Sequence, residues 1–192
     1  MSYTVERKEA IVYKVRLSPM GWARIYIEEW KGGGSFSCIS DYGNYNYIWN
    51  AIGSETLREF LCRLDYGFFM SKAHSSRSGV EFSTTEAVKV IKEDILRWRR
   101  EDISADDARN LWEYIEGVDT CLNYDLFCAF MADSPFCPNF YDYIDIPHIT
   151  RKIPECQGFW ENVWPAICQH WKEELAEDYC AMSMRTIDKS EW

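Results

Sequence analysis

The chain has 192 residues, of which 47% are hydrophobic and 27% charged, proportions that are typical of folded globular proteins and exclude a largely disordered chain. No apolar run reaches the length needed to span a bilayer, and the first residues lack the apolar core of a secretion signal, so we expect a cytoplasmic protein. The formal net charge of −10 is uneven, because residues 1–100 carry 15 Lys and Arg against 12 Asp and Glu, whereas residues 101–192 carry 6 against 19.

The N-terminal part predicts an antiparallel meander. Residues 10–17 and 22–30 alternate apolar and polar side chains, the period of a half-buried strand, and two shorter strands are expected at 36–40 and 45–49. Between the second and third strands, Lys31-Gly32-Gly33-Gly34 offers the positive dihedral angles of a tight turn. A phosphate-binding loop is disfavoured there because neither a helix nor a Lys-Ser/Thr pair follows.

After the meander the hydrophobic period becomes that of a helix. We expect helices that begin at a capping Ser54, at a capping box that starts with Ser83, and at Ser104. Pro165 should kink the last helix or mark a new start, and the segment 135–155, with four prolines, predicts irregular structure. The expected helices cover residues 55–64, 84–100, 105–116 and 122–131, and a long last helix begins near residue 157.

These elements predict an α+β protein. Its N-terminal four-stranded antiparallel meander packs on helices and continues into a mostly helical, acidic C-terminal half. The polar residues 73–79 are the best candidate for a boundary. They separate a meander-plus-helix domain at 1–72 from a helical region at 80–192, and these two parts could also form one continuous domain.

Eight cysteines occur without a C-x-x-C pair, so buried reduced thiols are predicted rather than disulfides. The alternative is a zinc site assembled across loops from Cys128, Cys137, Cys156 and His148. His148 is also the histidine best placed for catalysis, because it lies in the irregular segment. No partner motif accompanies it, so we predict no catalytic residue, no metal and no cofactor.

Three surface features are candidates for binding. The aromatic turn, in which about half of the rings are expected to point outward, contains Tyr42, Tyr45, Tyr47 and Trp49. The acidic face of the last helix contains Glu173, Glu174, Glu177 and Asp178. The basic island near the end of the helix at 84–100 contains Arg97, Arg99 and Arg100, which could hold a phosphate or complement the helix dipole.

A family resemblance adds a biological context. The run Ile39-Ser40-Asp41-Tyr42-Gly43-Asn44-Tyr45-Asn46-Tyr47-Ile48-Trp49, followed by Glu59-Phe60-Leu61 and Lys72, resembles a group of uncharacterised tailed-phage and prophage accessory proteins. The run Phe159-Trp160-Glu161-Asn162-Val163-Trp164-Pro165 is similar to that group as well, so the resemblance extends across most of the chain. It implies a protein made in a bacterial host, where small phage proteins often block restriction, CRISPR or signalling-based defences.

The resulting hypothesis is a non-catalytic inhibitor that binds a host defence protein. Its acidic half repels nucleic acid and attracts a basic partner, so it could occupy a basic nucleic-acid channel as a phosphate mimic. A second hypothesis is sequestration of a nucleotide or small anion by the basic island and the aromatic turn. A third is a metal-dependent hydrolase that uses clustered acids with His148.

Overall fold

The computed structural model describes residues 3–19, 21–75, 78–101, 103–119, 122–135 and 146–187, and the side chains of the last helix as far as Cys180. The chain forms two compact units, of which unit 1 comprises Met1–Gly79 with Ile153–Trp192 and unit 2 comprises Val80–Lys152. The sequence predicts one domain at 1–72 and another at 80–192, whereas the structure groups the last helix with the sheet. The reason is long-range, because the tryptophan stripe of that helix packs on the apolar face of the sheet.

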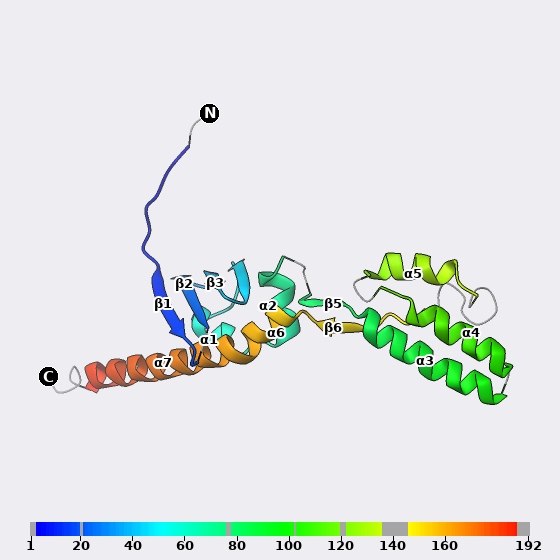
Figure 1. Ribbon diagram of the computed structural model, residues 1–192. Coiled ribbons are helices and arrows are strands. Elements are labelled where there is room, and N and C mark those ends of the chain that lie inside the picture. Colours follow the sequence, from blue (N-terminus) through cyan, green and yellow to red (C-terminus); the bar gives the residue numbers. More distant parts are fainter. Residues whose placement is uncertain are drawn as a thin grey trace. The chain divides into compact units, whose positions relative to one another are not determined.

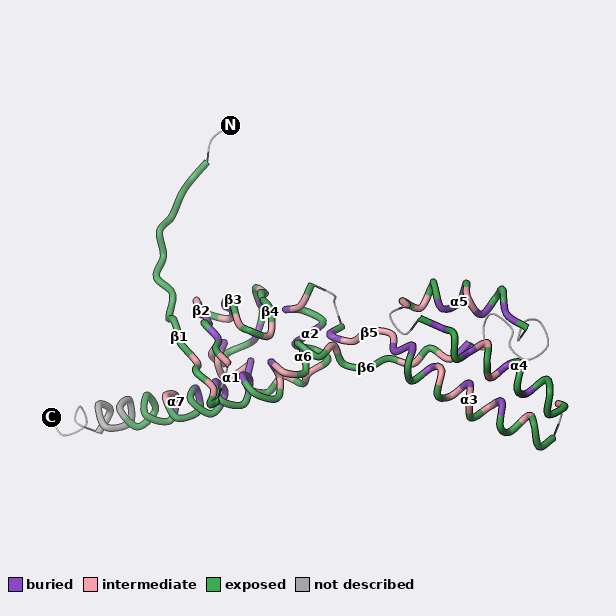
Figure 2. The backbone as a smooth tube through the Cα atoms, viewed as in Figure 1, coloured by how far each residue is buried: buried purple, intermediate pink, exposed green. Residues whose placement is uncertain are grey.

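Unit 1 is an antiparallel sheet with helices on one face (Figure 1). The strand order β1-β2-β3-β4 confirms the predicted meander and the α+β class. Its elements are β1 (Ile11–Arg16), β2 (Trp22–Trp30), β3 (Gly33–Ser40), β4 (Gly43–Trp49), α1 (Leu57–Leu61), α2 (Tyr66–Ala73), α6 (Pro154–Gly158), the π-helical segment η1 (Phe159–Val163) and α7 (Trp164–Ile187). Figure 2 shows that the segment before β1 is exposed along its described length.

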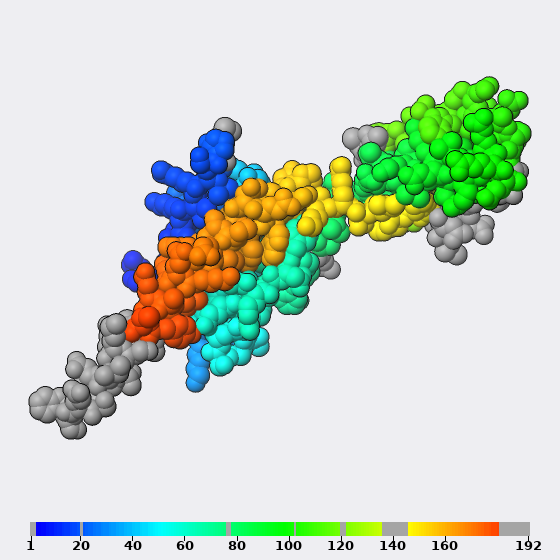
Figure 3. Space-filling view, turned by 90° about the horizontal axis from the view of Figure 1, so that it is seen from below, coloured from blue at the N-terminus to red at the C-terminus, as the bar shows by residue number. Residues whose placement is uncertain are grey.

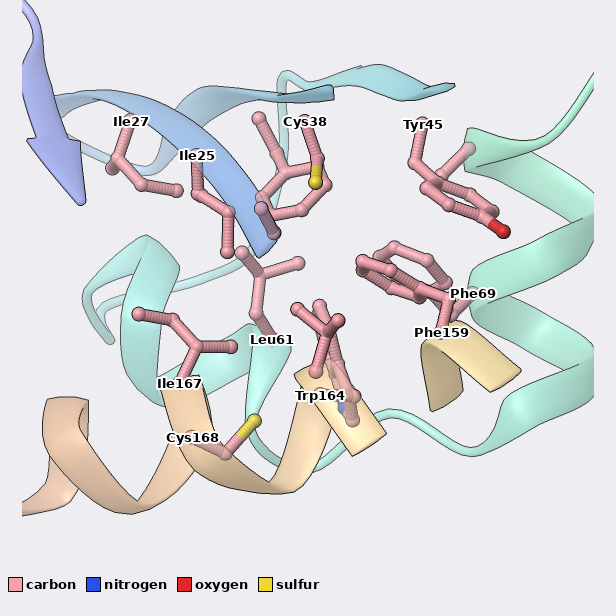
Figure 4. Close-up of a cluster of buried hydrophobic side chains, with 14 of the residues drawn as sticks. Ile25, Ile27, Cys38, Tyr45, Leu61, Phe69, Phe159, Trp164, Ile167 and Cys168 are labelled. Carbon is pink, nitrogen blue, oxygen red and sulfur yellow. The ribbon is translucent and has the colours of Figure 1, made fainter. Parts of the chain in front are cut away.

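The core of unit 1 lies between the inner face of the sheet and the helices. Ile25, Ile27, Cys38 and Tyr45 extend from the strands toward Leu61 of α1, Phe69 of α2 and Phe159, Trp164 and Ile167 of the last helical segment (Figure 4). Phe69 is at the centre of an aromatic cluster, with its ring centroid 4.4 Å from that of Trp164 and 5.6 Å from that of Phe36. This cluster joins three parts of the chain that are far apart in sequence.

The three consecutive glycines have different roles. Gly32 alone has a positive φ, of 79°, and lies in the β2–β3 turn, whereas Gly33 and Gly34 are buried residues of β3. A Cβ atom on Gly34 would lie 2.6 Å from Leu57 Cδ2 and 2.7 Å from the Glu28 carbonyl oxygen. The expectation that all three glycines form the turn is therefore wrong for the last two. Gly34 lets α1 approach the strand closely, whereas Gly33 makes room for the Trp30 ring and the Trp49 carbonyl.

We expect Gly34→Ala to lower the free energy of unfolding by about 1–3 kcal/mol, the usual cost of overpacking a core. The added methyl group meets a side chain on one side and backbone on the other, so little room is left for relaxation. Gly67→Ala in α2 is the control, because the nearest atom to its Cβ would be Asp65 Oδ1 at 3.3 Å. Thermal denaturation should show a loss for Gly34→Ala only, and equal melting temperatures for both variants would contradict this close approach.

Two local features of unit 1 differ from the sequence prediction. Helix α1 begins later than expected, because Thr56 is its N-cap in place of Ser54 and forms a capping box with Glu59. Helix α2, which Asp65 caps, was not predicted. At Pro165, where a kink or a new start is expected, helix α7 begins at Trp164 directly after the π-helical turn, in which the N–H of Trp164 donates to the carbonyl of Phe159. This turn adapts the helix to a residue that has no N–H to donate.

Unit 2 is helical and contains a short two-stranded ribbon. Its elements are β5 (Val80–Phe82), α3 (Thr84–Glu101), α4 (Ala105–Glu116), α5 (Tyr124–Ala132) and β6 (Thr150–Lys152). The predicted caps are confirmed, because Ser83 Oγ accepts from the N–H of Glu86 at 3.3 Å and Ser104 Oγ from that of Asp107 at 3.1 Å. Strand β6 was not predicted, because it lies in the segment 135–155 that was expected to be irregular. Residues 136–145 of that segment lie outside the described residues.

The core of unit 2 is formed by the facing sides of its three helices. Ala87, Ile91 and Ile95 of α3 are buried against α4 and α5. In Figure 2 the buried positions recur along α3, as expected for an amphipathic helix. None of the described helices of the two units is long and apolar enough to cross a membrane.

Candidate functional site

The aromatic turn belongs to the core and does not form an exposed surface. Tyr45, Tyr47 and Trp49 are spaced by two along β4 and therefore share one face, and Tyr45 and Trp49 are buried there. The Tyr45 ring stacks on Phe159 at a centroid distance of 4.1 Å, and burial raises the pKa of its hydroxyl. The expectation that about half of these rings point outward is wrong. The three rings occupy every second position of β4, and such positions lie on the same side of a strand.

The other two rings of the turn are half-buried. Tyr42 lies over Gly158, whose added Cβ would be 2.6 Å from the tyrosine ring. Tyr47 lies beneath Lys72, with Nζ 5.8 Å from the ring centroid. Both rings thus help to hold helices against the sheet. The turn therefore offers no stacking pocket for a nucleotide.

The acidic face of α7 is divided between an internal role and exposure to solvent. Glu174 Oε2 accepts from the hydroxyl of Tyr13 at 2.8 Å and lies 3.2 Å from Nη1 of Arg58. Glu173 is exposed and accepts only from Gln169 in the described residues, at 2.7 Å. Glu177 and Asp178 are also exposed. Figure 3 shows α7, in orange, along the surface of unit 1.

Arg58 joins three secondary-structure elements through its charge. Its Nη2 lies 3.1 Å from Oε2 of Glu29 on β2, while Nη1 contacts Glu174 on α7. Burial disfavours the guanidinium charge, but the hydrogen bond to Glu29 and the nearby carboxylates raise the pKa of Arg58 above its ordinary value. Burial and the hydrogen bond to Glu174 raise the pKa of Tyr13 to about 12. This network has a structural role, so Glu174 is not a free binding group.

The acidic half of the sequence is divided between the two units. Residues 80–152, which form unit 2, carry 15 Asp and Glu against 8 Lys and Arg. Residues 153–192, which belong to unit 1, carry 8 against 3. Each unit therefore has its own share of the negative charge.

The basic island lies on α3 in unit 2. Arg97 forms an ion pair with Asp94 at 2.6 Å, and Arg100 is exposed. Arg99 lines an open groove of about 470 Å³ between α3 and α4, together with Arg109 and Trp112. Glu113 and Glu116 line the same groove, so its charge is mixed. The groove is amphipathic, in contrast to the basic anion pocket that the sequestration hypothesis requires.

The described candidates for zinc ligands are divided between the two units. Cys128 is buried in the core of unit 2 and Cys156 in the core of unit 1, where burial raises the pKa of the Cys156 thiol. His148 is exposed and packs edge-on against Tyr124 at a centroid distance of 4.4 Å. Cys137 lies outside the described residues, which contain no group of three or more potential metal ligands.

The structure reveals a surface that the sequence analysis missed, on the outer face of the sheet. No helix described in unit 1 covers this face, which exposes several large apolar side chains. Lys14, Arg16 and Arg24 are exposed on the same face, beside Trp22. Alternation places Lys14 and Arg16 on one face of β1 and Trp22 and Arg24 on one face of β2, but only the pairing of the two strands brings these residues together.

No curated protein and no solved structure matches the chain. A family model described as a phage family matches residues 5–173 and thus includes most of both units. The expected phage resemblance is confirmed at this level, and the chain belongs to this phage protein family.

Proposed function

We propose that this phage-family protein inhibits a host defence system by binding one of its proteins directly, without catalysing a reaction. The observation that carries the proposal is the set of exposed carboxylates on α7. Glu173, Glu177 and Asp178 form no ion pair with any described residue, whereas Glu174 beside them does. A partner could therefore bind these exposed acids at the cost of only the exposed Gln169–Glu173 hydrogen bond.

The geometry of these acids suits a basic partner. Glu173 and Glu177 are four residues apart, so they lie on one side of α7 and about 6 Å apart along its axis. A channel that binds nucleic acid presents rows of Lys and Arg to regularly spaced phosphates. A helix that carries carboxylates at a regular spacing can occupy such a channel. The target we propose is a restriction or CRISPR protein with a basic nucleic-acid channel.

The test is binding to a panel of purified restriction and CRISPR effector complexes, with association rates measured at low and at physiological ionic strength. A triple variant, Glu173→Lys, Glu177→Lys and Asp178→Lys, should lower the association rate by about tenfold or more at low salt, the usual scale of electrostatic steering. The rate of the unmodified protein should fall as salt shortens the Debye length from about 30 Å at 0.01 M to about 8 Å at 0.15 M.

A matched control separates this face from net charge. Glu93→Lys, Glu101→Lys and Glu113→Lys introduce the same charge change at exposed positions of unit 2. The control should bind faster than the α7 variant, and both should keep the melting temperature of the unmodified protein. Equal rates for the two variants, or no effector bound, would refute the proposal.

A further inference from the structure

The outer face of the sheet contains a basic corner, which we define as Lys14, Arg16, Trp22 and Arg24. In the β1–β2 register, Lys14 is directly opposite Arg24, and Arg16 is directly opposite Trp22. All four side chains are exposed, and Trp22 is 44% accessible. Antiparallel pairing thus gathers three cations and one indole ring at one end of a single hairpin.

Folding does not explain this arrangement. Like charges that are directly opposite on adjacent strands destabilise a sheet. None of the three cations forms an ion pair with a carboxylate in the part of the chain that the structure describes. Arg58, by contrast, is paired with two carboxylates on the helical side of the sheet. The three cations therefore lack an ion-pair partner among the described residues, although the carboxylate of Asp41 binds the backbone N–H of Trp22 beside them. An anionic ligand would relieve their mutual repulsion.

The corner contains a depression, and a hydrogen bond ties the start of β2 to a neighbouring turn. A shallow depression of about 200 Å³ is lined by Lys14, Val15, Arg16, Trp22, Ala23 and Arg24. The N–H of Trp22 donates to Oδ2 of Asp41 at 3.0 Å, which holds the start of β2 in place. The depression is small for a whole enclosed ligand, since such pockets usually exceed about 300 Å³. It suits one planar group that belongs to a longer chain lying across the sheet.

We propose that this corner binds single-stranded nucleic acid, with a base stacked on Trp22 and the neighbouring phosphates contacting Lys14, Arg16 and Arg24. Stacking on an exposed aromatic ring beside a basic track is a general way of binding unpaired strands. Ser37, Asn44 and Asn46 lie on the same face and add polar groups along the path. A chain of carboxylates such as polyglutamate would use the cations but has no planar ring to stack on Trp22.

The net charge of −10 does not prevent this contact. At physiological ionic strength the Debye length is about 8 Å, so charges farther from the corner are largely screened. The acidic residues of α7 belong to the helices on the opposite face of the sheet. The proposal is independent of the proposed inhibition of a defence protein, and the two can fail separately.

The test is fluorescence polarisation of labelled oligothymidylate and oligouridylate of about 15 nucleotides. This length is close to the largest number of nucleotides that one small single-strand-binding domain covers. Trp22→Ala should raise the dissociation constant about tenfold through the lost stacking contact. Lys14→Ala with Arg24→Ala should reduce the slope of log K against log salt by about 1.4, since each lost phosphate contact is worth about 0.7 on single strands.

The matched control is Trp30→Ala, which removes a ring that is 40% accessible at the other end of the same face of β2. It should leave the dissociation constant unchanged, and every variant should keep the unmodified melting temperature. Three outcomes would overturn the proposal: no binding by about 100 µM protein, the weak end of non-specific affinity; equal binding of polyglutamate; or equal losses for Trp22→Ala and Trp30→Ala.

Discussion

Phe69→Ala should destabilise unit 1 by about 3–5 kcal/mol, the range for removing a buried aromatic ring from a core. Phe69 is fully buried, and its ring contacts Phe36 on β3, Phe159 in η1 and Trp164 at the start of α7. The lost free energy therefore has two sources. One is the buried apolar area of the ring, and the other is the set of aromatic contacts that join α2 to the sheet and to the last helical segment. Since a whole domain is stable by only about 5–15 kcal/mol, this loss is a large fraction.

The adjacent residue provides the control. Phe68 is on the same helix but is 42% exposed, so Phe68→Ala should change the free energy of unfolding by less than about 1 kcal/mol. Urea denaturation gives the two free energies, and hydrogen exchange of α3 and α4 reports on unit 2 separately. We expect faster exchange in the sheet of the Phe69→Ala variant and unchanged exchange in α3. A similar loss for both variants would mean that the cluster does not stabilise unit 1 in this way.

The fold could be predicted from the sequence wherever its cause is local. The four strands follow from alternation, because one face of each strand meets the core and the other meets solvent. The caps of α3 and α4 follow from Ser83 and Ser104. Each hydroxyl oxygen accepts a hydrogen bond from the backbone N–H three residues later, so the interaction is local in sequence. Helix α2 was missed because it is short and begins with Tyr66-Gly67, a poor start for a helical pattern.

Features that depend on distant partners could not be predicted in this way. The apolar stripe of α7 indicates that the helix packs on something, but the sheet as its partner is determined by the shape of the core. Likewise, the alternation of side chains along β4 shows that Tyr45 and Trp49 share a face. Only tertiary packing determines which of the two faces is buried. The acidic face was predicted from composition, and the internal role of Glu174 depends on Arg58, which is 116 residues away.

The basic corner needed both the strands and their register. Alternation places Lys14 and Arg16 on one face of β1 and Trp22 and Arg24 on one face of β2. Only the pairing of the two strands shows that Lys14 is opposite Arg24 and that a ring lies beside them. Sequence analysis singled out the basic island on α3 because its three arginines lie within four residues of the chain. Residues gathered by strand pairing are separated in sequence and are harder to recognise.

Arg58→Met should destabilise unit 1 by about 3 kcal/mol, near the lower end of the range for breaking a buried ion pair. The Arg58 side chain is only 12% exposed and contacts Glu29 and Glu174. Without the guanidinium, these two partly buried carboxylates keep their desolvation cost but lose the cation between them. Methionine has a comparable length and apolar character, so the change removes the charge with little loss of packing.

Arg63→Met on the same side of the protein is the control for a surface ion pair. The Arg63 side chain is 68% exposed and pairs with Glu55, so its loss should cost less than about 1 kcal/mol. A triple variant, Arg58→Met with Glu29→Gln and Glu174→Gln, tests the cause directly, because neutral amides carry no unpaired charge. We expect it to recover much of the stability lost in Arg58→Met, as measured by urea denaturation. If the triple variant is less stable than Arg58→Met alone, the uncompensated carboxylates are not the source of the loss.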